Sequence, residues 1–229
     1  MSLQEEHKQF KFTLITIAVP LYTVLLLWLI YWFEVNFEHN FTKYGVYPRT
    51  MNGLKGIFLS PFIHSGVRHL FNNSVPLFVL MTSLFYFYRP VALKILIFGT
   101  ILSGILTWLI ARDAYHIGAS GIVYLLFSFI FFSGIIRSYS RLIAVSLMVI
   151  FLYGSMIWFI FPFKEEISWE GHLSGFLIGL MFAIIYRKRG PKKAMYNWES
   201  DDYIEESDIL LDENGNFIDL RNEDENLEL

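Results

Sequence analysis

The chain contains no cysteine among its 229 residues. Disulfide bonds, thiolate metal sites and a catalytic cysteine are therefore excluded. Charged residues are also scarce, at 17% of the chain, whereas soluble domains usually carry about 25%. Basic residues are not interleaved with aromatic residues in the manner of a nucleic-acid-binding surface, so nucleic acid is not an expected partner.

Hydrophobic residues, by contrast, make up 55% of the chain, and they gather in long uncharged runs between residues 12 and 187. Runs of this length are typical of membrane spans, because a helix rising about 1.5 Å per residue needs roughly 20 residues to cross about 30 Å of hydrocarbon. The sequence predicts six transmembrane helices, at 12–33, 69–88, 91–110, 119–136, 142–162 and 172–187. The first run is too long for the core of a cleavable signal peptide, so we expect it to be an uncleaved anchor.

The distribution of lysine and arginine predicts the orientation of these helices. With the N-terminus inside, eleven basic residues lie near the cytoplasmic membrane ends and six lie outside, chiefly because of the cluster at Arg187–Lys193. We therefore expect an integral, multi-pass membrane protein with both termini in the cytoplasm, by default in a bacterial cytoplasmic membrane. The first outer loop, Glu34–Arg68, is rich in aromatic and apolar residues and is expected to lie in the membrane interface.

Three parts of the chain follow from this pattern. Residues 1–11 form a short cytoplasmic segment, and residues 12–187 form an all-α, six-helix membrane domain. Residues 188–229 form a tail in which, from Asn197 onward, thirteen residues are acidic and one is basic. Such an acidic composition predicts a disordered cytoplasmic tail.

Polar residues are costly inside a membrane, so their positions are informative. They form three clusters, which are His69 with Asn72 and Asn73, then Gly118–Gly121, then Gly171–His172 with Gly175 and Gly179. Each cluster lies at the start of the second, fourth or sixth predicted helix. Because these three helices run from outside to inside, the clusters are expected at one depth near the outer face.

The chemistry of these clusters predicts a serine hydrolase. Gly118, Gly121, Gly175 and Gly179 lack the side chains that would separate two helices. The Gly175–Gly179 pair in particular allows close helix approach, which would bring Ser120 near His172. A histidine in hydrogen-bond reach activates a serine hydroxyl as a nucleophile. His69 and Asn73 lie four residues apart on one helix face and can donate hydrogen bonds to an oxyanion, with the Ser120 N–H as a third donor. No Asp or Glu lies inside the second to sixth predicted helices, so a Ser-His dyad is expected.

The motifs that carry this pattern are Ser60–His64, His69–Asn73, Gly118–Gly121 with Tyr124, and Gly171–Gly175 with Gly179. Together they resemble the rhomboid family of intramembrane serine proteases. The resemblance implies that Ser120 is the nucleophile and His172 the general base. It places His69 and Asn73 in the oxyanion hole and Tyr124 against the His172 ring, with Gly118 and Gly121 supporting the site. It further implies transmembrane protein substrates that enter past the fifth helix and the loop after it, and no metal or ATP as cofactor.

Several alternatives remain beside this interpretation. Many rhomboids carry a Trp-Arg pair in the first outer loop, whereas this chain has Tyr47-Pro48-Arg49. Asn72 is an alternative to Asn73 as the oxyanion donor. His64 is expected to be structural, with no catalytic role. A zinc site built from four histidines (His64, His69, His116 and His172) lacks an HExxH motif, and Glu170 is placed on a loop. An inactive rhomboid-like protein that binds membrane clients and a small transporter or channel are the rival functions, and the sequence indicates neither a substrate nor an oligomeric state.

Overall fold

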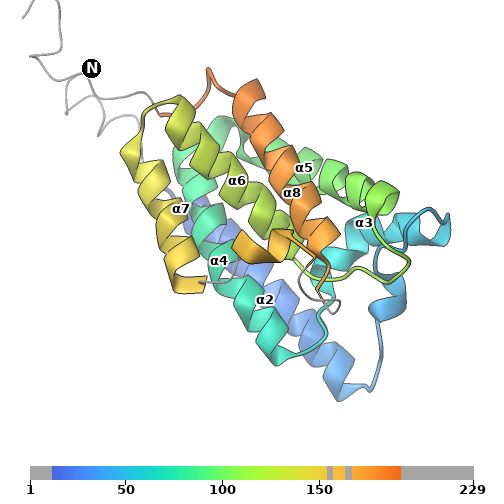
Figure 1. Cartoon of the computed structure of the whole chain (residues 1–229). Coiled ribbons are helices and arrows are strands. Elements are labelled where there is room, and N and C mark those ends of the chain that lie inside the picture. The colour runs from blue at the N-terminus through green and yellow to red at the C-terminus, as the bar shows by residue number, and fades with distance from the viewer. Residues whose placement is uncertain (1–11, 154–156, 163–166, 192–229) are drawn as a thin grey trace, which may run out of the picture. The chain divides into compact units, whose positions relative to one another are not determined.

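The computed structural model describes residues 12–153, 157–162 and 167–191. These residues lie in one helical unit, Phe10–Lys193. Its six longer helices are α2 (Leu14–Asn36), α4 (Val67–Phe87), α5 (Arg89–Ile110), α6 (Ser120–Ile136), α7 (Ser140–Tyr153) and α8 (Trp169–Ile185) (Figure 1). The predicted N-terminal segment 1–11 and residues 192–229 of the predicted tail lie outside the described residues.

The fold is all-helical, in agreement with the predicted class. Three helices, α2, α4 and α5, are long and apolar enough to cross a membrane, and α6, α7 and α8 are shorter apolar helices. Within the described ranges the only β-type pairing is one isolated antiparallel bridge between Val46 and His116.

Two of the predicted helices were wrong in extent. The helix predicted over 142–162 ends at Tyr153, and Ile157–Ile160 forms a separate 3-10 turn, η4. Residues 154–156, between the two elements, lie outside the described residues. The last helix begins at Trp169 rather than at residue 172, after Ser168 as N-cap. It therefore contains Glu170 in its first turn, where the helix dipole favours an acidic residue, and the placement of Glu170 on a loop was wrong.

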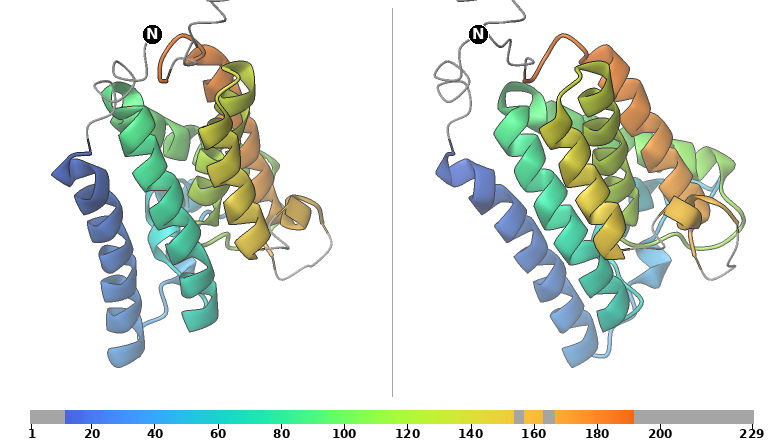
Figure 2. Two further views of the ribbon diagram at one scale, coloured as in Figure 1. Left: turned by 90° about the vertical axis from the view of Figure 1, so that its left-hand side faces the viewer. Right: turned by 60° about the vertical axis from the view of Figure 1, so that its left-hand side comes forward.

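The helix α6 lies at the centre of the helical unit. Eight consecutive residues, 123–130, are buried, and the helix contacts α4, α5, α7 and α8. A helix that is apolar on every side is buried on every side, and this one is made almost wholly of apolar residues. In contrast, α2 lies at the margin and packs on α4 (Figure 2), where the Trp28 indole donates to Ser74 Oγ at 3.0 Å.

The first loop is a folded segment of short helices. It contains η1 (Thr42–Tyr44), η2 (Asn52–Lys55), α3 (Gly56–Leu59) and η3 (Ser60–Phe62). Arg49 ties it to the end of α5, because its guanidinium donates to the Ala111 carbonyl at 2.7 Å and pairs with Asp113. On the same side, the Trp108 indole donates to the Thr50 carbonyl at 2.9 Å. Arg49 thus anchors the loop although no tryptophan precedes it.

Candidate active site

Ser120 is the first residue of α6, and the loop before it is held by the segment that follows α3. The Gly118 N–H donates to the Ser60 carbonyl at 2.9 Å, and the Ala119 N–H donates to His64 Nε2 at 3.4 Å. Gly118 has a φ of +109°, a conformation that residues with a side chain rarely adopt. Ser120 therefore stands in the first turn of a helix, where backbone N–H groups have no partner within the helix.

His172 lies opposite Ser120 on α8 and is buried. Its Nε2 is 2.8 Å from Ser120 Oγ, and its Nδ1 is 2.8 Å from the Phe159 carbonyl oxygen in η4. A carbonyl oxygen only accepts hydrogen bonds, so Nδ1 carries a proton, and in a neutral ring Nε2 is left to accept from the serine hydroxyl. The structure thus brings the two residues together in the geometry of a nucleophile and its base.

Tyr124, one turn after Ser120, stacks on the His172 ring. The ring centroids are 4.3 Å apart and the planes are inclined by 19°. Tyr124 is itself buried, so the imidazole is held on its face by the tyrosine and at its edge by Phe159. The packing that the family resemblance implied for Tyr124 is therefore present in the structure.

The close approach of α6 and α8 depends on glycine. A Cβ added at Gly175 would lie 2.1 Å from the Gly121 carbonyl oxygen, and one added at Gly179 would lie 2.2 Å from the Leu125 carbonyl oxygen. The predicted GxxxG contact is therefore found between these two helices. Gly118 plays a different part from the one expected, since it precedes α6 and does not separate the two helices. A Cβ there would lie 2.8 Å from His69 Nε2.

His69 and Asn73 lie on the first two turns of α4, on the face that meets Gly118. The position of a Gly118 Cβ is 3.5 Å from Asn73 Nδ2, and this amide nitrogen is buried without a hydrogen-bond partner within the described ranges. Ser65 Oγ lies 3.1 Å from His69 Nδ1. Asn72 is exposed, so Asn73 is the asparagine that faces the Ser120 loop.

His64 is buried beside this group, with its ring 5.0 Å from that of His69. Burial, and then the charge of a protonated His69, lower the pKa of His64 to about 4, against an opposing hydrogen bond to the Phe62 backbone. A neutral ring is what the hydrogen bond from Ala119 requires. Within the part of the chain that the structure describes, no three His, Asp or Glu side chains are grouped so as to hold a metal ion.

Sequence reasoning missed a buried polar cluster that lies next to the dyad. The Glu170 carboxylate accepts from the Arg112 guanidinium at 3.1 and 3.2 Å and from the Arg112 N–H at 3.2 Å. His116 Nδ1 lies 2.6 Å from Ser168 Oγ, and its Nε2 lies 3.0 Å from the Arg112 carbonyl oxygen. Burial lowers the pKa of His116, while that carbonyl and Glu170 act in the opposite direction. The sequence held one signal for this cluster, which is a carboxylate two residues before His172 in a chain with few charges.

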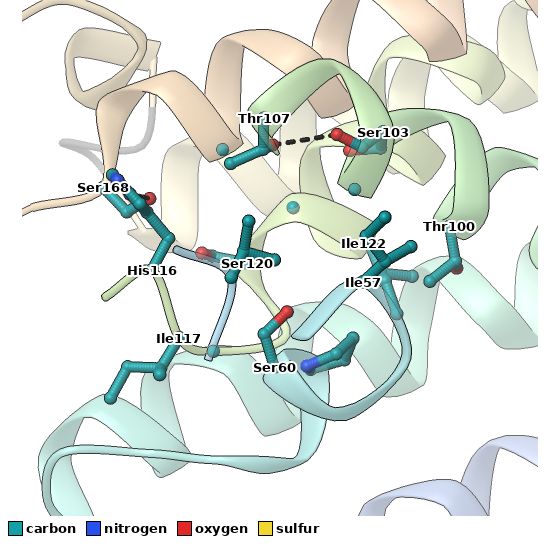
Figure 3. A pocket seen from close by; sticks show the side chains of 16 residues that line it. Ile57, Ser60, Thr100, Ser103, Thr107, His116, Ile117, Ser120, Ile122 and Ser168 are labelled. Atoms are coloured by element: carbon teal, nitrogen blue, oxygen red, sulfur yellow. Dashed lines mark hydrogen bonds between the residues drawn. The ribbon is translucent and has the colours of Figure 1, made fainter. Parts of the chain in front are cut away.

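A small cavity of about 50 Å³ lies beside Ser120. Hydroxyl groups from three elements line part of it, and Figure 3 shows those of Ser60, Ser103 and Thr107 around Ser120. A polar cavity of this size has room for water. The site therefore combines a serine, a hydrogen-bonded histidine, the Asn73 amide nitrogen and a polar space beside the serine.

Comparison with known proteins gives one family and several relatives. The profile of the Rhomboid domain matches residues 52–189. Uncharacterized proteins of Mycobacterium bovis and of Mycobacterium tuberculosis are each 32% identical over 152 residues, which is 62% of this chain and 62% of the relative. An uncharacterized protein of Mycobacterium leprae is 29% identical over 164 residues, 65% of this chain and 62% of the relative. The match thus spans about 62% of the length of these relatives.

Proposed function

Because this chain belongs to the rhomboid family, we propose that it is an intramembrane serine endopeptidase that cleaves transmembrane proteins within or near their membrane segment. The observation that carries the proposal is the 2.8 Å contact between Ser120 Oγ and His172 Nε2. Its partner contact, from His172 Nδ1 to the Phe159 carbonyl, supports the tautomer that a general base needs.

In the proposed reaction, Ser120 Oγ attacks the carbonyl carbon of the scissile bond while its proton passes to His172 Nε2. The resulting imidazolium is stabilised at Nδ1 by the Phe159 carbonyl and on its face by the Tyr124 ring. His172 then gives the proton to the leaving amine as the C–N bond breaks. In the second half, a water molecule loses a proton to His172 and attacks the acyl-enzyme, which releases Ser120 and a product carboxylate.

The negative charge of each tetrahedral intermediate needs donors placed beforehand. The buried Asn73 Nδ2 is one, since it has no partner within the described residues. His69 is a second, because a Ser65 hydroxyl that donates to Nδ1 leaves the proton on Nε2, the atom nearest Gly118. The Ser120 N–H, in the first turn of α6, is the third.

This arrangement works as a dyad. The carboxylate nearest in sequence to His172, that of Glu170, is turned to Arg112, and the Phe159 carbonyl takes the place at Nδ1 that an Asp occupies in a triad. We propose no metal or other cofactor, since proton transfer between the two side chains and oxyanion stabilisation are sufficient for peptide hydrolysis.

The proposed membrane topology has six crossings with both termini in the cytoplasm. The helices α6 and α8 have 17 residues each, which at about 1.5 Å per residue gives roughly 25 Å, less than the hydrocarbon thickness. Their starts, which carry Ser120 and His172, therefore lie below the outer surface, and water reaches them from that side. The mycobacterial relatives support a bacterial cytoplasmic membrane as the location.

A substrate helix has to reach the dyad from the lipid and to unwind there, because a helical peptide bond is shielded by its own turn. We propose entry past α7 and η4, where Phe151, Trp158 and, directly after η4, Phe161 are exposed. Residues 163–166 of the loop that was predicted to take part lie outside the described residues.

The test is labelling with a fluorophosphonate, which reacts only with an activated serine. The purified protein should be labelled, Ser120→Ala and His172→Ala should not be, and the matched control Ser146→Ala should be labelled like the wild type. Ser146 suits this purpose because it is buried on α7 and its hydroxyl donates to the Leu142 carbonyl in its own helix. Cleavage of a model transmembrane substrate in liposomes should follow the same pattern. A folded wild type that resists labelling and cleaves nothing would favour the rival function, an inactive rhomboid-like protein that binds membrane clients.

A further inference from the structure

Four side chains join the loop before Ser120 to the start of the helix that carries His172. They are Arg112 and His116 from the loop and Ser168 and Glu170 from α8 or its N-cap, and we call them the Arg112–Glu170 cluster. Figure 3 shows His116 and Ser168 at the wall of the cavity beside Ser120. None of the four takes part in the proposed reaction, so the gathering of their charges and hydrogen bonds in one place calls for another role.

The position of the cluster along the chain suggests that role. Glu170 is two residues before His172 on the same helix, and His116 is four residues before Ser120. The cluster therefore connects nucleophile and base through a second route, separate from their own hydrogen bond. The backbone of His116 is fixed in turn, because its N–H and carbonyl exchange hydrogen bonds with Val46 of the first loop at 2.8 and 3.0 Å.

The cluster is costly to bury, which argues that it does more than fill space. The Glu170 side chain is only 1% exposed, whereas Arg112 is 37% exposed. A carboxylate taken out of water loses hydration that an ion pair recovers only with good geometry and further hydrogen bonds. Here one guanidinium nitrogen of Arg112, Nη1, lies within hydrogen-bond distance of both Glu170 oxygens, and the other, Nη2, donates to the Ile167 carbonyl at 2.9 Å. We call this the fork of Arg112: its two nitrogens hold the Glu170 carboxylate and the Ile167 carbonyl at the start of α8, and the planar guanidinium fixes their direction.

The rest of the α6–α8 contact has less control over the axial position of α8. Gly175 and Gly179 lie against carbonyl groups of α6, and flat contacts of this kind set how close two helices come. Besides the bond between Ser120 and His172, the two helices share a hydrogen bond from Ser128 Oγ to the Phe176 carbonyl at 2.7 Å, about one turn beyond His172. The charged fork at Arg112 therefore adds a fixed point at the end where the reacting atoms lie.

We propose that Glu170 and Arg112 are positioning residues, which hold the start of α8 against the loop before Ser120 and so keep His172 Nε2 within reach of Ser120 Oγ. This inference rests on the proposed function, because it concerns the same dyad. A displacement of about 1 Å at a reacting pair can lower a rate by about a hundredfold. Loss of the fork should therefore slow the chemical step much more than it weakens substrate binding.

The test compares Glu170→Gln, which removes the charge at constant shape, with Glu170→Asp, which keeps the charge on a shorter side chain. The matched control is Asp113→Asn, because Asp113 is the next residue of the same loop and its pair with Arg49 is exposed. We expect Glu170→Gln to lower kcat and the rate constant of fluorophosphonate labelling by about tenfold to a hundredfold, with KM within about twofold of the wild type. Glu170→Asp should recover part of the loss, and Asp113→Asn should match the wild type.

Thermal unfolding in detergent separates positioning from folding. If Glu170→Gln does not fold, Arg112→Lys decides, because it keeps the positive charge beside Glu170 but loses the fork, and it should lower the labelling rate in the same way. Folded variants that react at the wild-type rate, or that lose activity through KM alone, would overturn the inference while leaving the proposed function intact. A wild type that neither reacts nor cleaves would instead overturn the proposed function.

Discussion

The carbonyl oxygen of Phe159 lies 2.8 Å from Nδ1 of His172, so a short 3-10 turn, η4, holds one edge of the proposed base. The turn follows α7 in the chain and packs on α8. Since the same segment presents exposed aromatic side chains where substrates are proposed to enter, a movement that admits a substrate would also act on the orientation of the histidine.

The first prediction concerns the proton on His172. Because the Phe159 carbonyl can only accept, the neutral ring should carry its proton on Nδ1 and leave Nε2 bare. The ¹⁵N chemical shifts of histidine-labelled protein in detergent near pH 8 report the tautomer, with His172→Gln to assign the signals. A proton found on Nε2 would contradict both the hydrogen bond to Phe159 and the direction of proton transfer proposed for Ser120.

The second prediction separates two adjacent asparagines. Asn73 is buried, and its amide nitrogen has no hydrogen-bond partner in the part of the chain that the structure describes, whereas Asn72 is exposed. Loss of one oxyanion donor typically lowers kcat by about a hundredfold or more, so Asn73→Ala should do so with little change in KM. Asn72→Ala is the matched control and should stay within about twofold of the wild type. Steady-state kinetics with a fluorogenic transmembrane substrate measures both, and the opposite order of effects would move the oxyanion role to Asn72.

Much of this site was predictable from the sequence because its polar residues all lie at the starts of helices that run in the same direction. Three polar clusters stand at the starts of alternate apolar helices, and helices of one direction bring their starts to one depth. That reasoning predicted the approach of Ser120 to His172 and the glycine contact at Gly175 and Gly179. It needed only helix direction and the small size of glycine.

The sequence did not reveal the contacts made by loops and short turns, because these segments have no regular residue pattern. The Phe159 carbonyl is a backbone group, and no residue type marks it. The pairing of Arg112 with Glu170 joins positions 58 residues apart, and it was missed because Glu170 was placed on a loop. The close approach of Gly118 to His69 also occurs in a loop with a positive φ at Gly118, and no residue pattern marks such a conformation. Loop geometry, rather than helix content, was the part that required a structure.

The third prediction tests the packing of α6 against α8. In Gly175→Ala the new methyl group would meet the Gly121 carbonyl oxygen at 2.1 Å, and backbone cannot give way as a flexible side chain does. We expect a loss of about 3 kcal/mol or more in unfolding free energy, with loss of fluorophosphonate labelling. Gly66→Ala is the matched control, because its Cβ would meet nothing within 4 Å and its φ of 173° suits any residue. Because Gly66 is the N-cap of α4, where alanine is less favourable than glycine, this substitution should cost no more than about 1 kcal/mol. Equal effects of the two substitutions on the midpoint of thermal unfolding would contradict the close contact.

The last prediction concerns the dependence of stability on pH, which follows from His64. Its pKa is lowered from 6.5 to about 4, first by burial, so between these values the unfolded state binds more protons than the folded state. The stabilising contribution is therefore complete above about pH 6.5 and is lost as the pH falls towards 4. The shift corresponds to a loss of about 2–3 kcal/mol over that window.

The variant His64→Gln can still accept from the Ala119 N–H but has no titrating ring, so it should lose less stability between pH 6.5 and pH 4 than the wild type does. His39→Gln changes an exposed ring and should keep the slope of the wild type. Chemical unfolding at a series of pH values measures all three proteins. If the unfolding free energies of His64→Gln and of the wild type fall equally between pH 6.5 and pH 4, the His64 ring is not held neutral by its burial. The hydrogen bond that it accepts from the loop before Ser120 would then be absent in solution.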